Sequence, residues 1–124
     1  MKRKFLCVTL VLMICLLAAV PTFADIHSAK VDYSRSLGIT PNNDGTYTYW
    51  GILKSNSVTN LSITLKLYNS SSISTPIAMS SNSANAKSVS ASGTVSLSSG
   101  SYTLEMICSI SSVSLSPVYY YYTV

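Results

Sequence analysis

The chain has 124 residues, of which 48% are hydrophobic and only 10% charged, and its formal net charge is +4. Three of its eight Lys and Arg residues stand at positions 2–4, so the chain from Asp25 onwards is nearly neutral, with five basic residues against four acidic ones. This balance excludes an electrostatic basis for binding nucleic acid, and the length allows one domain with a modest core.

The first 24 residues have the pattern of a secretory signal. Basic residues are followed by an apolar run from Phe5 to Val20 and by a short segment that ends in Ala24. Signal peptides have this order of a charged region, an apolar region and a cleavage region. The apolar run is shorter than the roughly 20 residues that cross a bilayer as a helix. We expect cleavage after Ala24, secretion of a domain over residues 25–124 and no stable transmembrane anchor; an uncleaved anchor is the alternative.

Strict alternation of apolar and polar residues dominates the rest of the chain and predicts β-strands. The alternation is clearest from Leu61 to Tyr68, where Leu and Ile at odd positions face one side. In chain order, the predicted strands cover residues 26–33, 46–54, 61–68, 73–79 with an interruption at Pro76, 88–97, 102–110 and 113–124. Turns are predicted at residues 41–45, 80–86 and 98–100 because Pro, Gly, Asn, Asp and Ser gather there.

Seven short strands at intervals of about ten residues predict an all-β, antiparallel two-sheet sandwich. No helix is expected after the signal, because no window shows apolar residues at helical spacing. The domain from Asp25 contains 25 Ser and nine Thr. These short hydroxyl side chains alternate with apolar residues in the predicted strands, so we expect them to coat the outer faces of the sheets.

The segment from Leu97 to Tyr102 reads Leu-Ser-Ser-Gly-Ser-Tyr and leads into a predicted strand. It resembles the tyrosine corner of immunoglobulin-like and fibronectin type III sandwiches. The resemblance implies an immunoglobulin-like sandwich in which Leu97, Gly100 and Tyr102 are structural and the Tyr102 hydroxyl caps backbone a few residues upstream. The chain lacks the paired cysteines of antibody domains. As a whole it resembles small secreted proteins of unknown function from Gram-positive bacteria. This resemblance implies an extracellular location and a fold but no activity.

Few residues in the domain could carry chemistry. Cys108 is the only thiol after Ala24, and His27 is the only imidazole in the chain. Cys108 shares its alternation with Tyr102 and Ile110, so we expect a buried structural side chain; a bridge between two molecules is the alternative. A Cys108 and His27 pair is conceivable, but with so few convergent groups we expect no enzyme, no metal site and no cofactor.

Tyrosine is the most informative residue type, because the domain has nine Tyr, one Trp and no Phe. Tyr combines an apolar ring with a polar handle and suits surfaces that stack on sugars or peptides. In an extended strand the four consecutive tyrosines near the C-terminus must alternate, and we expect Tyr120 and Tyr122 to face inward. The candidate binding surface therefore consists of the following residues: Tyr119 and Tyr121, joined by Tyr47 or Tyr49. Ordinary sheet packing is the alternative.

These observations predict a secreted, non-catalytic protein that acts by extracellular binding or structural association with an unknown extracellular or cell-surface partner. The C-terminal strand is the expected docking edge, with possible weak self-association, because an edge with few charges is poorly protected from strand addition. Two alternatives remain. One is a membrane-active or bacteriocin-like protein, since alternating strands also occur in membrane barrels. The other is a carbohydrate-binding module that uses an exposed tyrosine strip.

Overall fold

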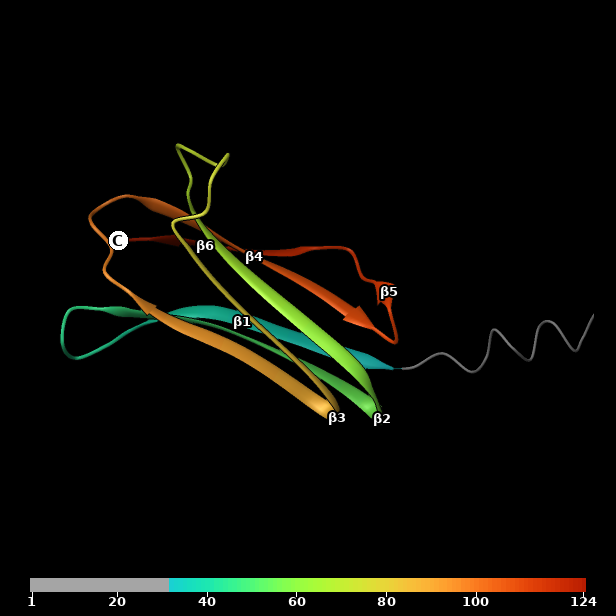
Figure 1. Ribbon diagram of the computed structural model, residues 1–124. Coiled ribbons are helices and arrows are strands. Elements are labelled where there is room, and N and C mark those ends of the chain that lie inside the picture. The colour runs from blue at the N-terminus through green and yellow to red at the C-terminus, as the bar shows by residue number, and fades with distance from the viewer. Residues whose placement is uncertain (1–31) are drawn as a thin grey trace, which may run out of the picture. The chain divides into compact units, whose positions relative to one another are not determined.

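The computed structural model describes residues 32–124, which form an all-β antiparallel domain (Figure 1). The predicted signal, its cleavage at Ala24, His27 and nearly all of the predicted strand at 26–33 lie outside the described residues. The six strands are β1 (Tyr33–Pro41), β2 (Tyr47–Asn69), β3 (Ala78–Val95), β4 (Ser101–Ile110), β5 (Val113–Ser114) and β6 (Val118–Thr123).

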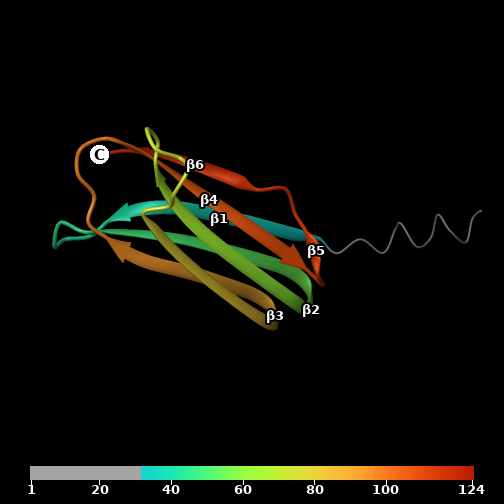
Figure 2. The ribbon, with the colours of Figure 1, turned by 45° about the horizontal axis from the view of Figure 1, so that its top comes forward.

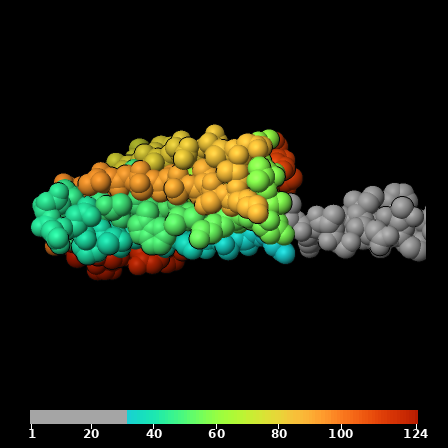
Figure 3. Space-filling model, turned by 90° about the horizontal axis from the view of Figure 1, so that it is seen from below, coloured from blue at the N-terminus to red at the C-terminus, as the bar shows by residue number. Residues whose placement is uncertain are grey.

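All six strands belong to one sheet, and the long strand β2 is its central strand, since it pairs with β1, β3 and β4. The first half of β2, residues 47–55, pairs with β1 on one side and with residues 88–95 of β3 on the other. Figure 3 shows β3 lying beside this half of β2 along one side of the domain. The second half of β2, residues 59–69, pairs with residues 78–86 of β3 and with β4. Strand β4 in turn pairs with β5 and β6.

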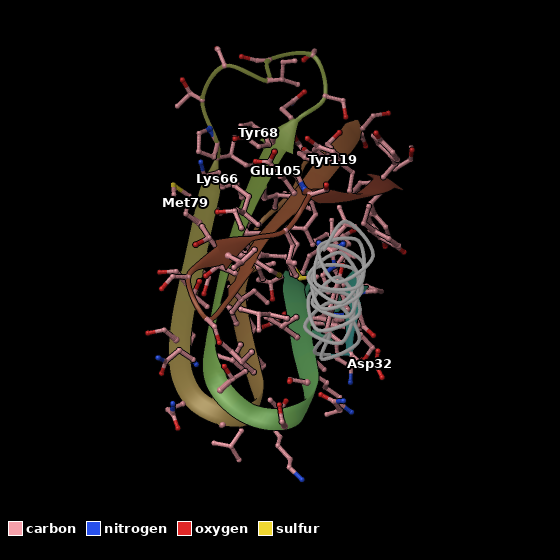
Figure 4. All side chains as sticks on the ribbon, turned by 90° about the vertical axis from the view of Figure 1, so that its right-hand side faces the viewer. Asp32, Lys66, Tyr68, Met79, Glu105 and Tyr119 are labelled. Carbon is pink, nitrogen blue, oxygen red and sulfur yellow. The ribbon has the colours of Figure 1, made fainter. Side chains whose placement is uncertain are left out.

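The sheet folds over its own core because β2 and β3 bend together. The register of their pairing shifts between Lys54 and Thr59, and irregularities of this kind bend strands and increase their twist. Figures 2 and 4 show both strands curving through this region. A Cβ atom built on Gly51, in the first half of β2, would lie 2.7 Å from Leu65 Cδ2 in the second half. The two halves of one strand therefore face each other across the core.

Apolar side chains at alternating positions of the strands fill this core. Odd positions of β2 and even positions of β4 point inward, as the sequence predicts. Eight side chains are completely or almost completely shielded from solvent: Leu53, Leu61, Ile63, Leu65, Leu67, Leu104, Met106 and Cys108. The intervening Ser and Thr side chains are half-buried or exposed, so hydroxyl groups coat the outside. The buried position of Cys108 agrees with the prediction.

The number and layout of the strands differ from the prediction. The strands predicted at 46–54 and 61–68 are the two halves of the single strand β2. The predicted turn at 80–86 is wrong, because these residues lie in β3 and pair with β2. Leu61, Ile63 and Leu65 in β2 provide a continuous apolar face, and the ladder beside it overrides the turn preference of Ser and Asn.

Three other segments were placed differently by the sequence. Strand β1 covers residues 33–41, whereas the predicted first strand ended at Tyr33 and residues 34–40 were assigned to no strand. Of the strand predicted at 73–79, only the last two residues are extended as part of β3. The strand predicted at 113–124 is divided into β5 and β6. The turns predicted at 41–45 and 98–100 are confirmed, as is the strand at 102–110.

The hydrogen bond expected from the tyrosine-corner resemblance is present. The Tyr102 hydroxyl donates to the backbone oxygen of Ser98 at 2.7 Å, and the Tyr102 side chain is buried. Gly100 sits between them with φ of 154°, and Leu97 packs against the core. This contact fixes the connection from β3 to β4.

Replacing Tyr102 with phenylalanine should lower the free energy of unfolding by about 1 kcal/mol, since it removes one hydrogen bond and keeps the ring. Chemical denaturation followed by circular dichroism measures the change. Tyr119→Phe is the matched control, because its hydroxyl bonds an exposed carboxylate instead. Equal stability of Tyr102→Phe and the unmodified protein would show that the corner hydrogen bond is dispensable.

Candidate functional site: the outer tyrosine face

The candidate site is the outer face of the half-sheet formed by residues 78–86 of β3, the second half of β2, β4 and β6. Two adjacent rows of side chains cross this face. The register of the strands places Met79, Lys66, Glu105 and Tyr119 in one row, and Tyr68, Thr103 and Tyr121 in the next. Figure 4 shows the labelled members of both rows gathered over these strands, away from Asp32. We call these seven residues the outer tyrosine face.

These side chains point outward because their neighbours in sequence point inward. Lys66 lies between Leu65 and Leu67, and Glu105 between Leu104 and Met106; all four flanking side chains are fully buried. Successive strand residues point to opposite sides of a sheet. The core therefore determines which residues form the outer tyrosine face.

Two tyrosines of β6 are the exposed aromatic members of this face. Tyr119 is 50% exposed and Tyr121 is 73% exposed, whereas Tyr120 and Tyr122 are half-buried on the inner side. This is the alternation predicted for the four consecutive tyrosines. The two exposed residues are two positions apart in an extended strand, so their Cα atoms are separated by about 7 Å.

The structure does not bring Tyr47 or Tyr49 to this face. Tyr49 is only 4% exposed and belongs to the core, and burial raises the pKa of its phenol. Tyr47 is half-buried and packs edge-to-face on Tyr122, with ring centroids 6.0 Å apart. Both lie on the inner side of β2 because they share the odd alternation of Leu53. The expected combination with Tyr119 and Tyr121 is therefore corrected: Tyr68 takes their place.

A carboxylate and an ammonium group lie beside the aromatic rings. The Tyr119 hydroxyl donates to Glu105 Oε2 at 3.1 Å. This hydrogen bond, as the main cause, raises the pKa of the Tyr119 phenol, since the carboxylate is an acceptor only for the protonated form. Lys66 is directly opposite Glu105 in the ladder. The face therefore offers one acceptor and one cationic donor beside its rings.

The same outer face continues into a hollow of about 330 Å³ near the bend of β2, which is lined by polar and apolar atoms alike. Its lining comes from three strands and the following turn: Asn60, Leu61, Ser62, Ser83, Ala84, Asn85, Ser109 and Ser112. The hydroxyl groups of Ser62 and Ser109 hydrogen-bond to each other, and Asn85 Nδ2 donates to Asn60 Oδ1 at 2.7 Å. This end thus offers hydroxyl and amide groups and no aromatic ring, while aromatic rings occupy the other end.

Sequence reasoning missed Lys66, Tyr68 and Glu105 as members of the site. Their alternation was visible in the sequence, since all three stand between inward-facing residues. Their proximity to Tyr119 was not visible, because it depends on β4 lying between β2 and β6. The lateral order of strands requires long-range pairing that alternation does not encode.

Three ionisable residues elsewhere, Cys108, Arg35 and Asp44, have structural surroundings that account for them. Burial raises the pKa of the Cys108 thiol, and the Arg35 guanidinium acts in the opposite direction. Arg35 also donates to the backbone oxygen of Ser116 at 2.6 Å. Asp44 accepts hydrogen bonds from the Thr46 hydroxyl and backbone N–H, which lower the pKa of its carboxyl. Among residues 32–124, no group of three or more His, Cys, Asp and Glu side chains is placed to hold a metal ion.

Comparisons with protein-family models, with curated proteins and with solved structures find no match to this chain. In the part of the chain that the structure describes, no helix has the length and apolar character needed to span a membrane. The fold and the site together define the class: an antiparallel β-sheet domain with an exposed aromatic face.

Proposed function

We propose that the protein is secreted and acts as a non-catalytic binding protein through the outer tyrosine face. The exposure of Tyr119 and Tyr121 on a sheet face with only two charged groups is the observation that supports this proposal best. Exposed aromatic residues at this density are more typical of recognition surfaces than of solvent-facing sheets. The signal-like N-terminus provides the reason to place this binding outside the cell.

Carbohydrate is the ligand class that best fits this face. A sugar ring presents a C–H surface that stacks on an aromatic ring, while its hydroxyl groups require many neutral donors and acceptors. The outer tyrosine face supplies the rings, and the hollow beside Ser62 and Asn85 supplies hydroxyl and amide groups on the same side. A polysaccharide chain that followed the strands would meet both.

The purified protein should be retained by an insoluble polysaccharide, and the double variant Tyr119→Ala/Tyr121→Ala should bind at least tenfold more weakly. Pull-down with isolated peptidoglycan, chitin and cellulose measures retention. Tyr33→Ala is the matched control, because Tyr33 is 45% exposed in β1 and outside the outer tyrosine face. Circular dichroism checks that every variant folds.

Two results would contradict this proposal. Absence of retention on all three polysaccharides would remove carbohydrate as the ligand class. Retention that the double variant keeps in full would move the binding site away from β6.

A membrane-active function is the second candidate, and exposed apolar side chains favour it. Ile73 and Ile77, in the connection from β2 to β3, are 71% and 48% exposed, and Met79 near the start of β3 is 56% exposed. These residues could insert at a lipid surface. Dye release from anionic liposomes separates the two functions: leakage that Ile73→Ser reduces supports membrane activity, and intact liposomes argue against it.

A further inference from the structure

One side of β6 has no neighbouring strand among residues 32–124 and forms a free edge of the sheet. β6 pairs with β4 and with no other strand of residues 32–124. Gly100 and Val124 exchange both of their backbone hydrogen bonds, at 3.2 and 2.9 Å. Hydrogen-bonded and non-hydrogen-bonded pairs alternate along an antiparallel ladder. Tyr122, Tyr120 and Val118 therefore also direct their backbone groups toward β4.

The remaining residues of β6 direct their backbone groups to the free edge. These residues are Tyr119, Tyr121 and Thr123, and all three have exposed side chains. Each carries one N–H donor and one C=O acceptor that β4 does not engage. The edge thus presents three evenly spaced donor and acceptor sets, with Tyr121 at the centre.

Other margins of the sheet carry features that protect against strand addition. Along β3, Ser80 Oγ donates to the backbone oxygen of Ser92 and Asn82 Nδ2 to that of Ser90, both at 2.9 Å. Along β1, Pro41 lacks an N–H group. Charges, prolines and side-chain coverage are the usual means of blocking an edge. β6 has no charged residue and no proline.

The inner side of β6 is also incompletely covered. The half-sheet that contains β6 has four long pairing segments, from β3, β2, β4 and β6, whereas the facing half has three, from β1, β2 and β3. Tyr120 and Tyr122 are accordingly only half-buried, with their rings stacked at 6.4 Å. A further strand beside β6 would cover these rings as well as satisfy the edge.

We propose that the strand beside β6 is β6 of a second copy of this chain, antiparallel and related by a two-fold axis at Tyr121. In this register Tyr121 faces Tyr121 of the second copy, and Tyr119 faces its Thr123. Each of these residue pairs exchanges two hydrogen bonds, so every free-edge group of β6 has a partner. Any other antiparallel register leaves at least one set unpaired.

The charge distribution agrees with a second copy as the occupant. A symmetric interface places each residue at the axis opposite itself, so a charge there would repel its copy. Position 121 is neutral, and the nearest charged side chain in the sheet, Glu105, lies one strand away opposite Tyr119. The dimer would also join the two outer tyrosine faces into one continuous surface.

Sedimentation velocity of the purified protein, from micromolar to millimolar concentration and without polysaccharide, tests the dimer. We expect the mass to double with concentration. Tyr121→Lys and Tyr121→Glu should each remain monomeric, because the same charge meets itself at the axis. An equimolar mixture of the two variants should form a heterodimer that high salt dissociates.

Tyr121→Pro and Val113→Lys complete the experiment. Tyr121→Pro removes a free-edge N–H while leaving the ladder to β4 intact, so it should stay folded and lose the dimer. Val113→Lys alters another exposed residue, in β5, and should keep the dimer. A protein that stays monomeric throughout overturns the proposal, as does a dimer that persists in Tyr121→Lys. A mixture that fails to pair excludes the axis at Tyr121. None of these results depends on whether the outer tyrosine face binds carbohydrate.

Discussion

Replacing Leu65 with alanine should lower the free energy of unfolding by about 3–5 kcal/mol. Leu65 has no exposed surface and lies at the middle of the second half of β2, opposite Met106 in the ladder. Truncating the Leu65 side chain removes apolar contacts and leaves a cavity. The pairing of β2 with β3 on one side and β4 on the other keeps the strands from closing this cavity. Urea denaturation followed by circular dichroism measures the change.

Ile73→Ala is the control for this prediction, because Ile73 is 71% exposed. We expect this surface substitution to change stability by less than about 0.5 kcal/mol. A similar effect of both substitutions would contradict the placement of Leu65 at the centre of the core.

Replacing Gly51 with alanine should destabilise the protein by about 1–3 kcal/mol. Local preference alone predicts the opposite sign, because glycine weakens a strand and alanine restricts the unfolded chain. The added Cβ atom would lie 2.7 Å from Leu65 Cδ2 and 2.8 Å from Met106 Sδ. Both neighbours are fully buried, so the new methyl group requires the ends of these side chains to shift within a packed core, which strains them. Thermal unfolding and urea denaturation measure the sign.

The double variant Gly51→Ala/Leu65→Ala provides the control for the face-to-face contact. Leu65→Ala opens space where the new methyl group would clash, so the double variant should lose less stability than the two single variants lose together. We expect a coupling of about 1 kcal/mol or more, as residues in direct contact show. Strictly additive effects would mean that the two halves of β2 do not touch at this point.

Alternation predicted the inside and outside of the domain well. It placed Cys108 in the core and divided the four tyrosines of β6 correctly, because burial on one side of a strand imposes a period of two. The segment from Leu97 to Tyr102 was also predictive, since a short local motif carries its own hydrogen bond.

Strand length and strand order were less predictable. The Ser-rich and Asn-rich segment at 80–86 has the composition of a turn, and only its ladder with β2 makes it extended. Residues 55–58, between the halves of β2, lack a clear alternation, so one bent strand resembled two separate strands in the sequence. For the same reason Lys66, Tyr68 and Glu105 could be assigned to an outer side but not to one site with Tyr119.

The passage of β2 and β3 through both facing halves has a consequence for how the domain opens. Both halves of the sheet contain parts of β2 and β3, so neither half can unfold as an independent unit. Movement of one half of the sheet displaces the other half, because β2 and β3 each continue from one half into the other. We therefore expect the folded arrangement to be lost cooperatively. The short strand β6 pairs only with β4, so it can exchange partners without disturbing the pairing between β2 and β3.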